Sequence, residues 1–126
     1  MNLHGIGIDV VEVERIAASL GKLGDAFLKR VFTPAERDYC MAHTDPAIHL
    51  AARFAAKEAV AKAFGTGIGK HAALTDIEVC HTASGAPEIA LHGAAAAYAA
   101  EHGISRVLVS LTHTARYAAA NAVAVG

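Results

Sequence analysis

The sequence has few of the residues that mark several large classes of protein. Its 126 residues include no tryptophan, two cysteines and three prolines. Two cysteines are too few for a disulfide framework, which argues against a disulfide-stabilised secreted scaffold. No apolar run approaches the ~18 residues that a membrane span needs. The start, MNLHGIGIDV, has no basic region and no small-residue cleavage site, so we expect no secretory signal and a cytoplasmic location.

Net charge is also nearly absent. Eleven lysines and arginines stand against 12 aspartates and glutamates, which leaves a formal charge of −1 at pH 7. Non-specific binders of nucleic acid or membrane surfaces are normally basic, so we expect neither partner. The charges are unevenly placed, since residues 1–62 carry 16 of the 23 charged side chains. We therefore expect the ionic chemistry in the first half of the chain.

Alanine supplies much of the hydrophobic content. Hydrophobic residues make up 54% of the chain, and about 30 of them are alanine, so large core side chains are few for this length. The length itself fits a single domain, 1–126. A thin core in an apolar chain suggests that more surface is buried between subunits, which favours an oligomer.

Capping residues mark where the expected helices begin and end. Thr33 and Glu36 form a capping box around a proline at the first helical position. Asp45 and Pro46 begin the next helix in the same way, and Gly65 ends it, which gives a helix of about 19 residues and ~28 Å. Helices are expected at 12–20 (closed by Gly21), 25–31, 34–41, 46–64 and 92–102.

Short apolar segments predict strands. In a strand over 3–8, Gly5 and Gly7 alternate, which indicates that another element packs closely on their face. Asp9 would lie where that strand ends. Further strands are expected at 76–81, 88–91, 106–112 and 117–125. Because these strands form hairpins, we expect an α+β fold, with a small antiparallel sheet packed on the long helix and on shorter helices.

Four charged residues lie within the long apolar helix. Glu58 and Lys62 share one face, and Arg53 and Lys57 form a neighbouring pair. A solvated face with a Glu–Lys ion pair explains this spacing without any function. Alternatively, Asp9 and Glu58 share a magnesium ion, because Mg²⁺ uses few protein carboxylates and completes its shell with water and substrate phosphate oxygens. Lys62 would then face the phosphate as a charge or a proton donor.

Three other features have both a structural and a functional interpretation. The glycine loop 65–70 follows a helix instead of opening one, so it is not a phosphate-binding P-loop. His113 ends an apolar strand at a tight turn, which suits a binding residue or a solvent-exposed turn. The segment 15–30, which includes Arg15 and Lys22, carries a net charge of +3. It is either a solvated helix face or a docking surface for an acidic protein.

Four motifs occur in the order and at the spacing of one known family. They are GIGIDVVEVERI at the start, RFAAKEAVAKAFGTGIG in the middle, SGAP later, and VSLTHT near the end. On these motifs the chain resembles holo-[acyl-carrier-protein] synthase, the small bacterial type of 4′-phosphopantetheinyl transferase, over nearly its whole length. The resemblance implies magnesium-dependent transfer of the phosphopantetheine arm of coenzyme A to a serine of apo acyl carrier protein, with release of adenosine 3′,5′-bisphosphate, in fatty-acid biosynthesis.

The resemblance also implies roles for individual residues. Asp9 and Glu58 match the ligands of Mg²⁺ (Mn²⁺ is possible), and Glu58 and Lys62 match the catalytic residues, with Lys62 near the diphosphate. The residues that match coenzyme A-binding positions are Arg53, Lys62, Gly65, Gly85, Pro87 and His113. Arg15 and Lys22 match the surface that docks the acidic helix of the carrier protein. Small members of the family form homotrimers with sites at subunit interfaces, which suits the thin core.

One position departs from the family's usual pattern, and two other functional classes stay open. Ala86 stands where the family often has lysine, which would remove a phosphate contact and weaken coenzyme A binding. A non-catalytic coenzyme A or adenine-nucleotide binding module is one alternative, although binding alone does not need the carboxylate pair. A structural, trimer-forming protein is the other. Within the family, a carrier from polyketide or peptide synthesis is an alternative acceptor.

Overall fold

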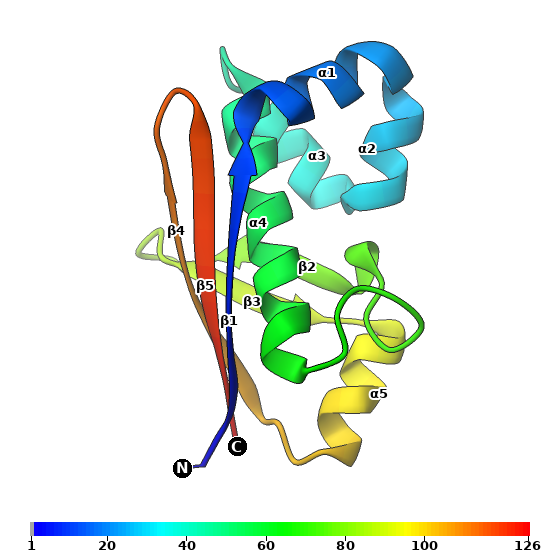
Figure 1. Ribbon diagram of the computed structural model, residues 1–126, viewed down its shortest axis with the longest axis vertical. Coiled ribbons are helices and arrows are strands. Elements are labelled where there is room, and N and C mark those ends of the chain that lie inside the picture. The colour runs from blue at the N-terminus through cyan, green and yellow to red at the C-terminus, as the bar shows by residue number, and fades with distance from the viewer. Residues whose placement is uncertain (1) are drawn as a thin grey trace.

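The long helix α4 (Pro46–Phe64) runs through the middle of the structure, a computed structural model that describes residues 2–126 (Figure 1). It begins after Asp45 with a proline in its first turn, as predicted. It ends at Gly65, whose φ of 82° is the left-handed cap that favours glycine. Alanine is its commonest residue, so neighbouring backbones approach it closely.

Two small antiparallel sheets pack around α4 (Figure 1). The larger has the order β1–β5–β4 and consists of β1 (Leu3–Glu12), β5 (Tyr117–Val125) and β4 (Arg106–His113). The smaller is the hairpin of β2 (Ile77–His81) and β3 (Pro87–Leu91). The predicted α+β class and antiparallel pairing are confirmed, and the sheet is divided into these two parts.

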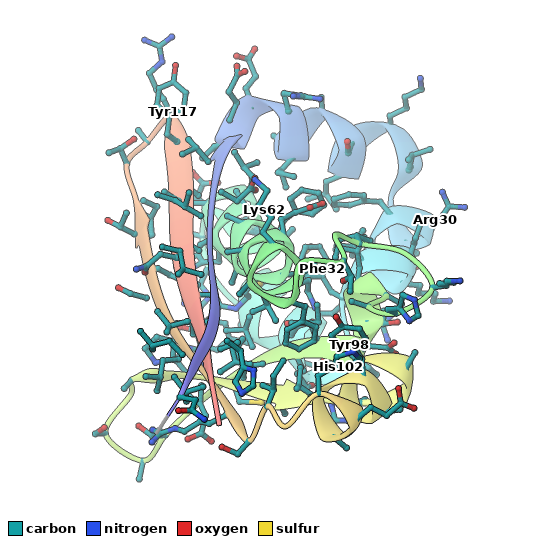
Figure 2. All side chains as sticks on the ribbon, turned by 60° about the horizontal axis from the view of Figure 1, so that its bottom comes forward. Arg30, Phe32, Lys62, Tyr98, His102 and Tyr117 are labelled. Atoms are coloured by element: carbon teal, nitrogen blue, oxygen red, sulfur yellow. The ribbon has the colours of Figure 1, made fainter. Side chains whose placement is uncertain are left out.

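Four shorter α-helices complete the fold. They are α1 (Val13–Leu23), α2 (Asp25–Val31), α3 (Pro34–Met41) and α5 (Gly93–Glu101), and the 3₁₀ turn η1 (Leu74–Asp76) precedes β2. The first three surround the N-terminal half of α4, and α5 lies beside its C-terminal end (Figure 1). There the ring of Tyr98 stacks on His102, with ring centres 3.9 Å apart (Figure 2). The predicted capping box of α3 is present, since Thr33 accepts from the N–H of Glu36 and Glu36 accepts from that of Thr33.

The first strand is longer than predicted, which changes the place of Asp9. β1 pairs with β5 as far as Glu12, which lies opposite Tyr117. The prediction that Asp9 lies where a strand over 3–8 ends is therefore wrong, because pairing with β5 carries the strand past it. Asp9 lies inside β1, on the same face as Gly7, toward α4.

The end of the first helix was also predicted wrongly. We expected Gly21 to close it, but α1 continues to Leu23. Gly21 lies within the last turn, and the N–H of Gly24 donates to the carbonyl of Leu20. Gly24 has a φ of 55°, a backbone conformation that favours glycine, and the helix ends there.

The glycines of β1 let strand and helix meet backbone to backbone. A Cβ atom at Gly7 would lie 1.9 Å from the carbonyl oxygen of Ala59, and one at Gly5 would lie 2.0 Å from that of Ala63. No real contact is that short, so any side chain at either position would push β1 away from α4. The close approach predicted from the alternating glycines is confirmed.

The opposite face of the larger sheet is apolar and open. Ile6, Ile8 and Val10 of β1 are 75%, 65% and 62% exposed, and Leu108 of β4 and Tyr117 of β5 are exposed as well. An exposed apolar face of this kind is typical of an interaction surface. Within residues 2–126, no helix combines the length and the apolar character that crossing a membrane would require.

Candidate active site

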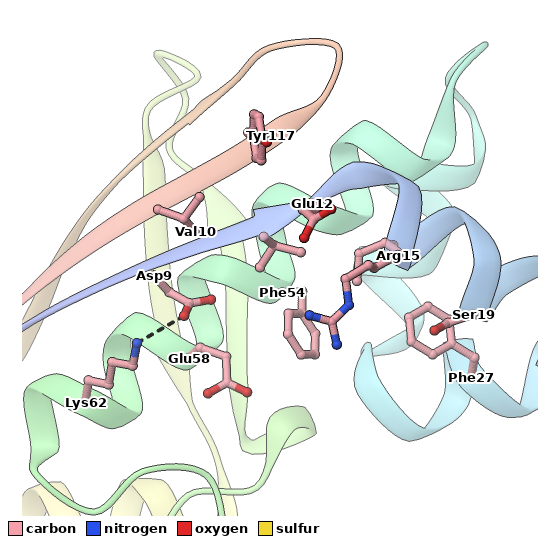
Figure 3. A pocket seen from close by; sticks show the side chains of 12 residues that line it. Asp9, Val10, Glu12, Arg15, Ser19, Phe27, Phe54, Glu58, Lys62 and Tyr117 are labelled. Atoms are coloured by element: carbon pink, nitrogen blue, oxygen red, sulfur yellow. Dashed lines mark hydrogen bonds and ion pairs between the residues drawn. The ribbon is translucent and has the colours of Figure 1, made fainter.

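A cavity of about 620 Å³ lies between β1, α1 and α4 (Figure 3). Asp9 reaches it from β1, Glu58 and Lys62 from α4, and Arg15 from α1. These residues come from distant parts of the chain and meet because Gly5 and Gly7 let β1 lie directly on α4. The remaining lining residues are Val10, Val11, Glu12, Ile16, Ser19, Phe27, Phe54 and Tyr117.

Two carboxylates and one ammonium group form the charged end of this cavity. The Nζ of Lys62 donates to Oδ1 of Asp9 at 3.0 Å and to the carbonyl oxygen of Ile8 at 2.9 Å. Glu58 lies one helical turn before Lys62 and faces the same side (Figure 3). Partial burial and the nearby charge of Asp9 raise the pKa of Glu58, and Lys62 opposes this rise. Asp9 and Glu58 are therefore close enough to repel each other.

The donor set at this end suits a hard divalent cation. A cation between the two carboxylates would relieve the repulsion that raises the pKa of Glu58. No cluster of three or more His, Cys, Asp or Glu side chains gathers as a metal site in the described part of the chain. A cation held by Asp9 and Glu58 would thus complete its shell with water or substrate oxygens, as Mg²⁺ commonly does.

The other end of the cavity carries the positive charge of α1. The guanidinium of Arg15 points toward the cavity, near Phe54 and Phe27 (Figure 3). Lys22 lies two turns further along α1, exposed and outside the cavity lining. The two basic residues therefore extend from the cavity along the surface of α1.

Arg53 and His113 meet away from this cavity. Arg53 is 4% exposed, although it lies on the helix that carries Glu58. Its guanidinium lies 4.2 Å above the centre of the Tyr39 ring, and its NH2 lies 3.3 Å from Nε2 of His81. His113, at the end of β4, reaches the same group of rings through His49.

The three other residues implied in coenzyme A binding are also outside the cavity of Asp9. Gly65 caps the C-terminus of α4, and Gly85 lies in the turn between β2 and β3 with a φ of 90°. Pro87 begins β3 and, with Ala86, lines a separate groove of about 410 Å³ between β3 and β4. Within one chain, the implied binding residues are thus distributed over several surfaces.

The solvated-face interpretation of the long helix is wrong for two of its four charges. Arg53 is buried, and Lys57 is fully buried. The Nζ of Lys57 lies 2.7 Å from Oε1 of Glu36 and also donates to the carbonyls of Leu74 and Ile77. The sequence did not reveal this pair. Glu36 is 21 positions from Lys57, and the capping box of α3 already explained why a glutamate stands there.

Both the sequence and the fold of this chain are similar to those of known proteins. A model of the 4′-phosphopantetheinyl transferase superfamily matches residues 5–122. A curated holo-[acyl-carrier-protein] synthase of Chlamydia trachomatis serovar D is 47% identical over 122 residues, which cover 97% of this chain and 99% of that protein.

Solved structures agree with the sequence match. A holo-[acyl-carrier-protein] synthase from Neisseria meningitidis superposes with a TM-score of 0.92 at 39% identity, covering 99% of this chain and 100% of that one. One from Helicobacter pylori, solved in complex with coenzyme A, superposes with a TM-score of 0.85 at 32% identity, covering 95% of this chain and 99% of that one.

Proposed function

The chain belongs to the 4′-phosphopantetheinyl transferase superfamily, and from that premise we propose that it converts apo acyl carrier protein into holo acyl carrier protein. Coenzyme A is the donor, a serine of the carrier is the acceptor, and adenosine 3′,5′-bisphosphate is the second product. The main observation behind the proposal is that Asp9, Glu58 and Lys62 line one cavity. We place the reaction in the cytoplasm, in fatty-acid biosynthesis, in a single domain of residues 1–126.

Transfer of the phosphopantetheine group requires mainly that the reactants are positioned and that the negative charge of the diphosphate is neutralised. The serine oxygen bonds to the β-phosphorus of coenzyme A while the bond to the leaving nucleotide phosphate breaks. Asp9 and Glu58 would hold Mg²⁺, which supplies Lewis-acid stabilisation of the diphosphate oxygens. Lys62 is half-exposed, and its Nζ is 3.0 Å from Asp9, so it can turn from Asp9 to the leaving phosphate oxygen. Its ammonium group then balances the charge that develops there.

The serine proton needs an acceptor near the metal pair. Burial and Asp9 raise the pKa of Glu58, which makes its carboxylate a better proton acceptor than an ordinary glutamate. The proton passes either to Glu58 or to a water that an acidic side chain of the cavity orients. Glu58 cannot easily serve as a tight ligand and as the base in the same step.

Coenzyme A binding is best explained by more than one copy of the chain. Arg53, Gly65, Gly85, Pro87 and His113 do not line the cavity of Asp9, so a second subunit would have to bring some of them to it. The exposed apolar face of the larger sheet offers a surface for that contact. We therefore propose a homotrimer with its active sites at the subunit interfaces.

Carrier docking fits the surface of α1. Arg15 lies at the mouth of the cavity and Lys22 continues the positive charge outward, so an acidic helix could lie along α1 with its serine toward Glu58. Electrostatic attraction of this kind speeds association and fixes the register of the partner.

The intact mass of apo acyl carrier protein tests the proposal directly. Incubation with this protein, coenzyme A and Mg²⁺ should add one phosphopantetheine, and EDTA should prevent the addition. An unmodified fatty-acid carrier would redirect the search to carriers of polyketide or peptide synthesis. No modification of any of these carriers would contradict the transferase and favour a non-catalytic binding module.

A further inference from the structure

Lys62 pairs with one of the two carboxylates that would hold the divalent cation. Its Nζ donates to Oδ1 of Asp9 at 3.0 Å (Figure 3) and to the carbonyl oxygen of Ile8 at 2.9 Å. Within residues 2–126 no other basic side chain forms an ion pair with Asp9, and none forms one with Glu58. The ammonium group of Lys62 and a divalent cation would therefore compete for the carboxylate of Asp9.

Both contacts of this ammonium group are easily exchanged. The side chain of Lys62 is 51% exposed and that of Asp9 is 17% exposed, and water reaches both hydrogen bonds. An exposed ion pair contributes little to stability, and the lysine stem is flexible. Lys62 can therefore leave Asp9 for a stronger anion at a small cost in free energy.

The charges at this end of the cavity favour a cation and a diphosphate together. The carboxylates of Asp9 and Glu58 and the ammonium group of Lys62 leave one negative charge when all three are ionised. A divalent cation alone would turn this into one positive charge, and a diphosphate alone would add its two negative charges to it. Both ligands together restore the original charge. Each ligand therefore lowers the electrostatic cost of binding the other.

We propose that Lys62 makes the binding of the divalent cation and the binding of the diphosphate cooperative. With its ammonium group on Asp9, Lys62 opposes the cation. A bound diphosphate attracts that ammonium group away from Asp9 and leaves the carboxylate to the cation. The inference rests on the proposed function, in which the diphosphate belongs to coenzyme A. Because the two binding equilibria are linked, the cation strengthens the binding of coenzyme A by the same factor.

This role of Lys62 in binding is separate from the charge that it supplies to the leaving phosphate. A catalytic role alone concerns the rate of transfer and leaves the affinity for the cation unchanged. Measurement of cation binding without any turnover therefore distinguishes the two roles.

Mn²⁺ binding to the full chain tests the inference. The electron paramagnetic resonance signal of free Mn²⁺ gives its dissociation constant without and with saturating coenzyme A, corrected for the Mn²⁺ that coenzyme A binds by itself. In Lys62→Met we expect Mn²⁺ to bind about 2- to 5-fold more tightly without coenzyme A, the scale of an exposed ion pair. The gain should be smaller with coenzyme A, where the ammonium group has already left Asp9. The ratio of the two constants, which measures the cooperativity, should therefore fall.

Lys29→Met is the matched control. It removes the same charge from an exposed position on α2 that does not line the cavity, so both Mn²⁺ constants should match those of the unchanged protein. Equal tightening in Lys29→Met and Lys62→Met would show an effect of net charge alone and overturn the inference. An equal gain in Lys62→Met with and without coenzyme A would also overturn it, because Lys62 would then oppose the cation in both states.

The carrier-mass experiment gives an independent result. Carrier modification by the unchanged protein, with undiminished cooperativity in Lys62→Met, would leave the proposed function standing and remove the inference. Cooperativity that falls in Lys62→Met, without modification of any carrier, would support the inference and contradict the transferase. No binding of coenzyme A at all would overturn both.

Discussion

Lys57 and Glu36 hold three parts of the fold together with charges that solvent does not reach. Both side chains are fully buried, and their polar atoms are shared with the carbonyls of Leu74 and Ile77 and with the N–H of Val79. At this scale the sequence predicted which residues carry charge in the long helix. It could not predict which of these charges are buried. Burial depends on how β2 and η1 pack against α4, and no local sequence pattern reveals that packing.

Replacement of Lys57 tests the importance of this pair. Lys57→Met leaves the Glu36 carboxylate buried without its cation, so we expect a loss of about 3–5 kcal/mol in the free energy of unfolding. Urea denaturation measures the loss. Lys62→Met is the control on the same helix, because Lys62 is half-exposed and its ion pair with Asp9 should contribute less than about 1 kcal/mol. Similar losses in the two variants would contradict the structural role of Lys57.

Replacement of Glu58 separates function from stability. Glu58→Gln keeps the shape of the side chain and removes its charge, so we expect carrier modification to fall by at least about 100-fold, the scale of one lost acid–base or metal contact. The fold should remain intact. At neutral pH the melting temperature should not fall, because Glu58 has a raised pKa and its ionised form is disfavoured beside Asp9.

The sign of this stability effect gives a control. A raised pKa means that the stabilising contribution of protonated Glu58 is present at acid pH and is lost as pH rises through that pKa. Any gain in melting temperature in Glu58→Gln should therefore disappear below the ordinary pKa of a glutamate. Near-normal carrier modification by this variant would contradict the role of Glu58 as ligand or base.

Secondary-structure elements were predicted well where local chemistry defines them. The capping box of α3, the proline and Gly65 that bound α4, and strand β5 lie where the sequence placed them. The end of β1 was missed because pairing with β5 determines it, and the end of α1 was missed because two glycines three residues apart each offer a cap. Elements set by distant partners are therefore the ones that local patterns describe least well.

The contact of β1 with α4 depends on the missing side chain of Gly7. In Gly7→Ala the new Cβ would lie 1.9 Å from the carbonyl oxygen of Ala59, so β1 must shift and carry Asp9 away from Glu58. We expect a loss of about 3 kcal/mol or more in unfolding free energy, the upper range for overpacking.

Gly21→Ala is the control, because nothing lies within 4 Å of that Cβ and the site is helical. It should stabilise by up to about 1 kcal/mol. A fully stable Gly7→Ala variant would contradict the close contact.

The positive charge on α1 gives a kinetic prediction. Arg15→Glu reverses one charge at the mouth of the cavity, so the KM for the carrier should rise about tenfold or more while the KM for coenzyme A changes less. Steady-state kinetics with each substrate varied in turn measures the difference. The effect should shrink as salt is added, because the attraction is screened. An unchanged carrier KM at low salt would count against docking on α1.

At the scale of the whole molecule, one chain does not assemble all of the implied site. The cavity of Asp9 and Glu58 is lined by residues of one chain, but Arg53, Pro87 and His113 lie outside its lining. Asp9, Glu58, Lys62 and Arg15, which the resemblance of the motifs implied, lie together at the cavity, and Glu12, which it did not imply, lines the cavity too. The sequence could not predict how the remaining residues reach the substrate, because in the trimer that we propose this depends on contacts between copies of the chain.

The open face of the larger sheet gives the last prediction. Ile8 is 65% exposed on that face, and the side chain of Asp9 beside it points the opposite way, toward the cavity. If the face joins subunits, Ile8→Lys should bury a charge in an apolar interface and dissociate the trimer, which light scattering measures. Carrier modification should fall with it by at least about tenfold, since each buried unpaired charge costs several kcal/mol.

Ala97→Lys on the exposed side of α5 is the control and should leave the mass and the activity unchanged. A stable monomer with full activity would show instead that one chain binds coenzyme A alone, and that Arg53 and His113 act at a separate site.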